Sequence, residues 1–172
     1  SNGRVDTAIG RPAPQAIDAL LKKWRLERNV CRVERTATWF DWRYGEEALN
    51  NYEWVSAYRD GSLVCSGVWG MQNAAWGEIA DGRAHLTELL GTDEEGLSAI
   101  IAVMIEQARK ANAMLLETFC NLQPAAKLLR RAGFFAHRLA PFIVRSITDR
   151  TSNPDIYAHS NWRIMGGDVD TF

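Results

Sequence analysis

The sequence predicts an α/β domain with three layers, in which a mixed central sheet is flanked by helices. Residues 52–72 alternate apolar and polar side chains in two runs joined by Asp60-Gly61, a dipeptide that tolerates the positive φ angles of a tight hairpin turn. Residues 83–133 then follow the order strand, helix, strand, helix, and strands joined by helices pair in parallel. A hairpin followed by such crossovers predicts a mixed sheet with helices on both faces.

Two helices are expected before the hairpin. Residues 15–26 follow Pro14 and predict an amphipathic helix, because their apolar side chains recur at helical spacing. These apolar positions are Ile17, Leu20, Leu21 and Trp24. Residues 36–49 predict a second, shorter helix, with Thr36 or Thr38 as its N-cap.

The elements after the hairpin begin with a strand in residues 83–91. A long amphipathic helix is expected in residues 93–112, with an apolar stripe. The stripe consists of Leu97, Ile100, Ile101, Met104, Ile105 and Ala108. A strand in residues 113–120 and a helix in residues 124–133 follow, and residues 133–147 predict two short strands or one bent strand.

The composition limits the class of protein. The chain has 172 residues, 47% of them hydrophobic, and a net charge of −1, which suits one well-buried domain with tails. Because neither Lys nor Arg is in excess and no long basic run occurs, no nucleic-acid or membrane-surface partner is expected. No apolar run reaches about 18 residues, and the N-terminus lacks the apolar stretch of a secretory signal. These features predict a cytoplasmic protein.

The cysteines and histidines predict no metal site. Cys31, Cys65 and Cys120 are odd in number and widely spaced, which argues against both a disulfide framework and a zinc site. The three histidines form no metal-binding spacing with them. Cys120 has no His or basic activator beside it in the sequence, so it is expected to be an inert thiol.

The chain divides into three parts. Residues 1–15 are rich in Gly, Pro and small polar side chains and predict a linker or the remnant of a cleaved tag. Residues 16–147 contain all the periodic segments and predict one domain. Residues 148–172 have no clear period and predict an irregular tail.

The order of these segments resembles the GNAT superfamily of acyl-CoA N-acyltransferases. The hairpin, the strand "AHLTELLG", the helix after it, the strand "AMLLETFC" and the closing "LLRRAGF" correspond in order to that fold, over residues 18–147. The resemblance implies a GNAT-like fold and the transfer of an acyl group, acetyl or longer, from acyl-CoA to an amine. A small-molecule amine or amino sugar is the implied acceptor. "FDWRYGE" and "NWRIMGGDVDTF" also resemble stretches in the C-terminal half of two-part members, which implies a partner domain that this sequence lacks.

The resemblance places the acyl-CoA diphosphate at the loop "GTDEEGLS". In the superfamily, glycines and exposed amides at the start of a helix hold the phosphates in this loop. The implied cofactor residues are Leu89, Leu90, Gly91, Gly96, Leu97 and Ser98. The loop lacks the superfamily's Gln or Arg and carries Asp93, Glu94 and Glu95, whose charges repel a diphosphate. The alternative is that these carboxylates satisfy the helix N-terminus, with Thr92 or Asp93 as the cap.

Two further positions bear on catalysis. Many members place a Tyr four residues before the Gly-Phe that ends the last helix, and Leu129 stands there in this chain, so it cannot give a proton to the leaving thiolate. Glu88 is the candidate general base, because some members use a carboxylate on this strand. By alternation, Glu88 shares a strand face with Leu86 and Leu90. The alternative for Glu88 is a structural carboxylate paired with a basic neighbour such as Arg83.

Two functions therefore follow from the sequence. The first is an acyl-CoA-dependent N-acyltransferase in which Glu88 accepts the amine proton and the backbone amides of residues 89–91 polarise the thioester carbonyl. The second is a catalytically degenerate domain of the same fold that binds a ligand or a partner domain.

Overall fold

The structure is a computed structural model that describes residues 3–24, 31–45, 51–71, 82–136, 162, 163 and 165. In chain order the elements are β1 (Val5–Ile9), α1 (Pro14–Trp24), β2 (Cys31–Arg32), α2 (Ala37–Tyr44), β3 (Tyr52–Arg59), β4 (Ser62–Met71), β5 (Arg83–Leu90), α3 (Glu94–Lys110), β6 (Leu115–Glu117), α4 (Ala125–Arg131) and β7 (Trp162–Arg163).

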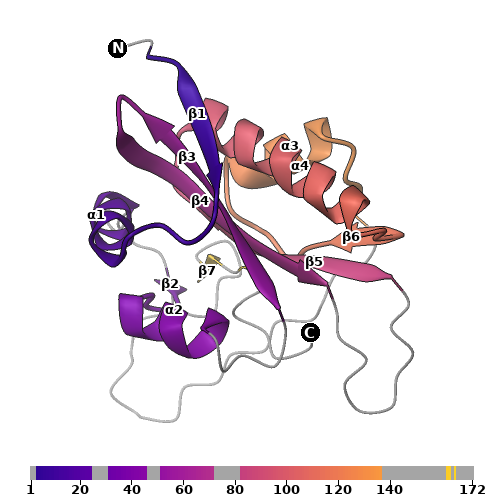
Figure 1. The fold of residues 1–172 in the computed structure, drawn as a ribbon, viewed down its shortest axis with the longest axis horizontal. Helices are drawn as coiled ribbons and strands as arrows, with labels where there is room; N and C mark the ends of the chain where they lie inside the picture. Colours follow the sequence, from indigo (N-terminus) through magenta and orange to yellow (C-terminus); the bar gives the residue numbers. More distant parts are fainter. Residues whose placement is uncertain are drawn as a thin grey trace.

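The central sheet is mixed, as predicted. Its strands lie in the order β1-β3-β4-β5-β6, and β5 and β6 form the parallel pair while the other neighbours are antiparallel. Helices α1 and α2 lie on one side of this sheet and α3 and α4 on the other (Figure 1). The three-layer α/β architecture is therefore confirmed.

The hairpin turn forms at the expected dipeptide. Arg59 of β3 pairs with Ser62 of β4, so Asp60 and Gly61 alone connect the strands. Both have positive φ, 50° for Asp60 and 75° for Gly61, as a two-residue turn requires.

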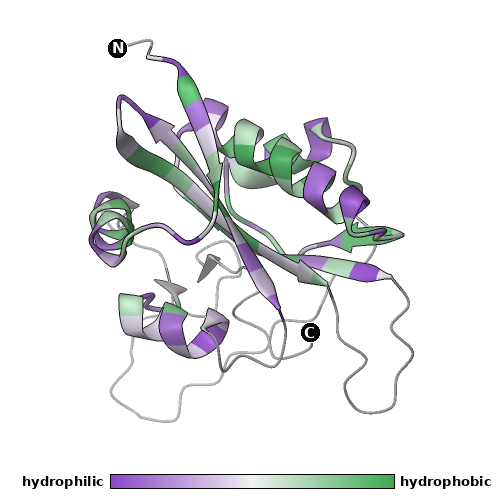
Figure 2. Cartoon of the chain, in the orientation of Figure 1, coloured by the Kyte–Doolittle hydropathy of each residue, from purple (hydrophilic) through white to green (hydrophobic). Residues whose placement is uncertain are grey.

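The helices bury the side chains that their spacing predicts. Ile17, Leu20, Leu21 and Trp24 of α1 are all buried. On α3 the buried side chains are Leu97, Ile100, Ile101, Met104 and Ala108, and Ile105 is half-buried. Hydrophobic residues concentrate where α3 meets the strands (Figure 2). Gly67 of β4 lets α3 approach closely, since a Cβ there would lie 2.8 Å from Met104 Cε.

The two ends of the chain differ from the prediction. Val5–Ile9 form the edge strand β1 instead of a linker, paired with β3. The sequence shows no apolar alternation here, because four of the five side chains are exposed and neither face of the strand requires apolar residues. In the predicted irregular tail, Trp162–Arg163 pair with Cys31–Arg32 and Met165 bridges to Cys120, contacts that no local pattern encodes. The predicted strands in residues 137–147 lie outside the described residues.

Candidate functional site

A bulge in β5 sets the direction of the Glu88 side chain. Val68 of β4 pairs with Glu88, and the next residue, Trp69, pairs with Leu86, so Thr87 is the extra residue on β5. Because Val68 and Trp69 point to opposite faces, so do Glu88 and Leu86. The predicted shared face of Leu86 and Glu88 is therefore wrong, since alternation stops at the bulge.

Glu88 is fully buried in an ion pair with Arg35. Its Oε2 lies 2.9 Å from Arg35 Nε and its Oε1 lies 3.2 Å from Arg35 Nη2, which makes the contact bidentate. The hydroxyl of Tyr44 on α2 donates to Glu88 Oε1 at 3.0 Å. The suggested partner Arg83 instead approaches Glu117, at 3.9 Å.

Arg35 is held by aromatic rings from two helices. Its guanidinium lies 5.9 Å from the ring centroid of Trp24 on α1 and 5.1 Å from that of Trp39 on α2. Its Nη1 also donates to the carbonyl of Val33 at 3.2 Å. The sequence reasoning missed Arg35, because it lies 53 residues before Glu88 and no local pattern connects the two.

Two neighbouring groups remain protonated at neutral pH. Burial, and after it the charge of Glu88, raise the pKa of Tyr44 far above its ordinary value, so this hydroxyl acts as a donor. Burial also raises the pKa of Cys120 to about 11, and the charge of Glu88 adds to the rise. A protonated thiol is a poor nucleophile, which agrees with the expectation that Cys120 is inert.

The pairing of strand β5 with β6 ends at His85, three residues before Glu88. Its parallel pairing with β6 joins residues 83–85 to residues 115–117, whereas its pairing with β4 continues to Leu90. Leu89 and Leu90 are buried and are paired with Gly67 and Ser66 of β4. In the described part of the chain, the β6 edge of residues 86–90 is therefore outside the sheet pairing.

In the acidic loop, residues 91–98, a carboxylate accepts a backbone amide of the same loop. Asp93 is the N-cap of α3, and its carboxylate accepts the Gly96 amide at 2.7 Å. Arg59, at the end of β3, reaches the same loop from another strand: its Nη2 lies 3.1 Å from Asp93 Oδ2 and 2.7 Å from Glu95 Oε2. Of the two alternatives for the carboxylates, the capping role of Asp93 is thus confirmed.

Packing explains both glycines of the loop. Gly91 has φ of 108°, and a Cβ there would lie 2.5 Å from the carbonyl oxygen of Val64. A Cβ on Gly96 would lie 3.0 Å from Cys65 Sγ. Leu97 is buried, while Ser98 on the next position is exposed. The loop therefore needs glycine for the β4 contact alone, whether or not phosphate binds there.

A shallow pocket of about 140 Å³ opens beside this loop. Its walls come from α1, from the start of β4 and from the loop: Leu20, Lys23, Trp24, Leu63, Val64, Gly91, Thr92 and Asp93. Trp24 lies between the pocket and the Arg35 ion pair: it lines the pocket, and its ring contacts the Arg35 guanidinium.

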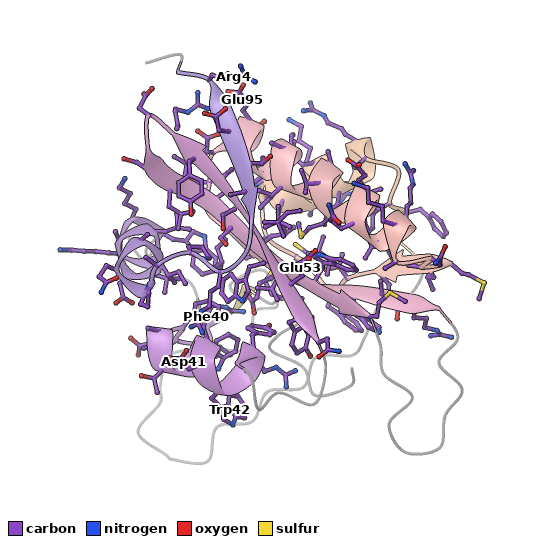
Figure 3. The ribbon with its side chains drawn as sticks, in the orientation of Figure 1. Arg4, Phe40, Asp41, Trp42, Glu53 and Glu95 are labelled. Carbon is purple, nitrogen blue, oxygen red and sulfur yellow. The ribbon has the colours of Figure 1, made fainter. Side chains whose placement is uncertain are left out.

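The rest of the described structure bears on the predicted acid, on α2, and on metal and membrane binding. Leu129, at the position of the superfamily's acid, is buried in the core from α4. Phe40, Asp41 and Trp42 lie on α2, across the sheet from α3 (Figure 3). Within the described residues, no cluster of three His, Cys, Asp or Glu could hold a metal ion, and no helix is long and apolar enough to cross a membrane.

No protein-family model matches the chain, and no curated protein matches it either. Solved structures do match. The ribosomal-protein-alanine N-acetyltransferase from Brucella melitensis biovar Abortus 2308 is 16% identical, with a TM-score of 0.55 over 83% of this chain and 99% of its own. An aminoglycoside acetyltransferase from an uncultured soil metagenomic sample is 11% identical, with a TM-score of 0.53 over 83% and 97%.

A third match carries the superfamily's name. It is a putative acetyltransferase of the GNAT family from Desulfovibrio desulfuricans, 22% identical, with a TM-score of 0.52 over 77% of this chain and 87% of its own. At such identities the likeness is one of fold, and it agrees with the order of elements described above. The chain therefore has the fold of the GNAT acetyltransferases.

Proposed function

We propose that this chain is an acyl-CoA-dependent N-acyltransferase that transfers an acetyl or longer acyl group to an amine. The observation that carries the proposal is the position of Glu88, a buried and ion-paired carboxylate at a bulge, three residues past the last β5 residue that pairs with β6. A buried charged group at an irregular point of a sheet is typical of a functional site. The fold shared with N-acetyltransferases supports the same reaction class.

The residues would have the following roles in the reaction. The amine nitrogen attacks the thioester carbonyl and forms the amide bond, and the C–S bond breaks to release CoA as a thiolate, which takes a proton from solvent. Glu88 accepts the proton that the amine loses. The backbone amides of residues 89–91 would polarise the carbonyl, and the amides at the start of α3 would hold the diphosphate of acyl-CoA. A cytoplasmic location is part of the proposal. A small amine or amino sugar is the proposed acceptor; an aminoglycoside acetyltransferase with a similar fold supports the amino sugar.

Binding and turnover of acyl-CoA test the proposal. Calorimetry and thermal shift with acetyl-CoA and longer acyl-CoAs should give a saturable signal, and free thiol should appear when a panel of amines is added. Glu88→Gln should lower kcat/KM by about 10²–10⁴, the usual contribution of a general base. Glu106→Gln is the matched control, because Glu106 is exposed on α3 and, among the described residues, pairs with Lys110 one turn away. Absence of heat and of thermal shift at millimolar acyl-CoA would refute the proposal.

One observation favours the second function, a binding module without catalysis. Asp93 occupies the Gly96 amide, and Arg59 holds Asp93 and Glu95 at the start of α3, where the diphosphate would sit. The double variant Asp93→Asn, Glu95→Gln separates the two functions. If only this variant binds acetyl-CoA, the acidic loop has closed the cofactor site and the binding module is favoured. If the wild type binds at least as tightly as the variant, the loop is compatible with acyl transfer.

A further inference from the structure

We propose that Arg35 and Tyr44 are positioning residues that keep the Glu88 carboxylate charged and fixed in direction, and so set the pH range in which it accepts a proton. The inference rests on the proposed acyl transfer and adds two residues that the resemblance does not assign. Both residues precede the hairpin: Arg35 lies just before α2 and Tyr44 at its end.

Burial alone would work against a base at this position. Glu88 has no solvent exposure, and removal from water favours the neutral form of a carboxyl group, which cannot accept a proton. A cation and a hydroxyl donor reverse that preference, because both stabilise the charged form. Arg35 supplies two contacts, at 2.9 and 3.2 Å, and Tyr44 supplies one, at 3.0 Å.

The direction of the carboxylate is fixed because its partners are themselves fixed. Trp24 and Trp39 contact the Arg35 guanidinium, so α1 and α2 both hold it in place. The Tyr44 ring packs edge-on against Trp39 at 5.8 Å and against Tyr52 at 4.8 Å, between centroids. A general base needs such a rigid surrounding shell, since its geometry must hold within a fraction of an ångström.

Other ionisable groups lie near Glu88. By the β4 register His85 shares the Glu88 face of β5, and its Nδ1 lies 3.5 Å from Glu117 Oε1. Burial is the main reason that the pKa of Cys120, after β6, rises to about 11, and the nearby Glu88 charge adds to that rise, so the thiol is uncharged at neutral pH. Arg43 acts on Tyr44 and lowers the pKa of that hydroxyl, but burial and Glu88 outweigh it. Helix α3 lies on the opposite face of the sheet (Figure 1). Arg35 and Tyr44 are the partners to vary because both contact the Glu88 carboxylate oxygens directly.

The test compares Tyr44→Phe with Tyr58→Phe. Tyr44→Phe removes one donor to Glu88 and keeps the packed ring, whereas Tyr58 lies half-buried on β3 away from the cluster and serves as the control. Two measurements are made: the Glu88 titration by carboxyl ¹³C NMR, assigned with Glu88→Gln, and the pH profile of kcat/KM. Loss of one hydrogen bond to a buried charge should raise the acidic midpoint by about one pH unit in both.

The result expected is a kcat/KM about tenfold lower below the midpoint, with the plateau at higher pH unchanged. Arg35→Lys, which keeps the charge and loses the bidentate contact, should shift the midpoint in the same direction. A midpoint that stays in place in Tyr44→Phe, or moves as far in Tyr58→Phe, would overturn the inference. If no acyl-CoA is turned over, the proposed function fails, and the NMR titration alone still decides whether Arg35 and Tyr44 control the ionisation of Glu88.

Discussion

At the scale of single residues, Asp93 shows how one side chain serves a helix and an ion pair together. Partial burial alone would raise its pKa, but the Gly96 amide and Arg59 outweigh that effect and hold the pKa below its usual value. A carboxyl whose pKa is lowered on folding stabilises the native state above its unfolded pKa, near 4. This contribution is lost as the pH falls through the lower, folded pKa.

Variants of Asp93 separate its two contacts. Asp93→Ala should lower the free energy of unfolding at pH 7 by about 1 kcal/mol, within the usual 0.5–2 kcal/mol of an N-cap. Asp93→Asn keeps an acceptor for the Gly96 amide and loses the charge that faces Arg59, so it should cost less. Urea unfolding at pH 7 and at pH 3 measures both. The deficit of Asp93→Asn should shrink at pH 3; a deficit that does not depend on pH would contradict the assigned ion pair.

The sequence predicted part of this residue-scale picture. A short polar side chain before an amphipathic helix indicates an N-cap, and of the two predicted candidates, Thr92 and Asp93, the structure has Asp93 as the cap. Arg59 could not be predicted, because it comes from the far side of the hairpin and meets the loop only after β3, β4 and β5 pair. Arg35 could not be predicted either, because its contact with Glu88 forms only when α1 and α2 pack on the sheet.

At the scale of elements, the start of α3 is packed tightly against β4. Cys65 on β4 places its Sγ 3.0 Å from the position of a Cβ on Gly96, and the Asp93 carboxylate lies 3.2 Å from that position. Burial raises the pKa of Cys65 to about 12, so the thiol is an uncharged packing group. The close contact explains why a helix tolerates glycine in its first turn, where alanine has the higher helix propensity.

A double-mutant cycle tests this contact. Gly96→Ala should destabilise the protein by roughly 1–3 kcal/mol, because the added methyl overpacks the junction. In a Cys65→Ala background the same change should become neutral or favourable, since space is freed and alanine gains up to about 1 kcal/mol over glycine in a helix. Urea unfolding of the four proteins gives the coupling energy. Equal effects of Gly96→Ala in both backgrounds would show that Cys65 does not limit the space.

The elements themselves were predicted unevenly. The hairpin, α1 and α3 carry clear periodicities and lie where the sequence placed them. Strand β6 covers Leu115–Glu117 only, although the apolar run suggested residues 113–120, because pairing with β5 sets its limits. The bulge at Thr87 was not predictable, since apolar residues fill both faces of β5 and alternation carries no information there.

At the scale of the whole molecule, the C-terminal segment joins regions that are distant in sequence. Strand β7 pairs in parallel with β2, shortly before Arg35, and Met165 forms a bridge to Cys120 after β6. Met165 has no solvent exposure and belongs to the hydrophobic core. Trp162–Arg163 and Met165 thus pair with two segments that lie far apart in the sequence.

Truncation of the Met165 side chain measures what this segment contributes. Met165→Ala should lower the free energy of unfolding by about 2–5 kcal/mol, the range for a buried methionine. Met114→Ala is the control, because Met114 is 81% exposed and its loss should stay within about 0.5 kcal/mol. Chemical denaturation followed by tryptophan fluorescence reports both. A Met165→Ala protein as stable as Met114→Ala would place the segment outside the cooperative unit.

The sequence by itself determined most helices and strands of the three-layer mixed sheet and the hairpin turn, and it limited the cap of α3 to Thr92 or Asp93, because each of these depends on side chains that are neighbours along the chain. Only the tertiary structure decided the direction and the partners of Glu88, the contacts of Arg59 with the acidic loop, and the strand pairing of Val5–Ile9 and Trp162–Arg163. Each of these features depends on contacts between segments that lie dozens of residues apart in the sequence. A periodic pattern predicts that a side chain is buried, but it does not predict which distant residue that side chain contacts.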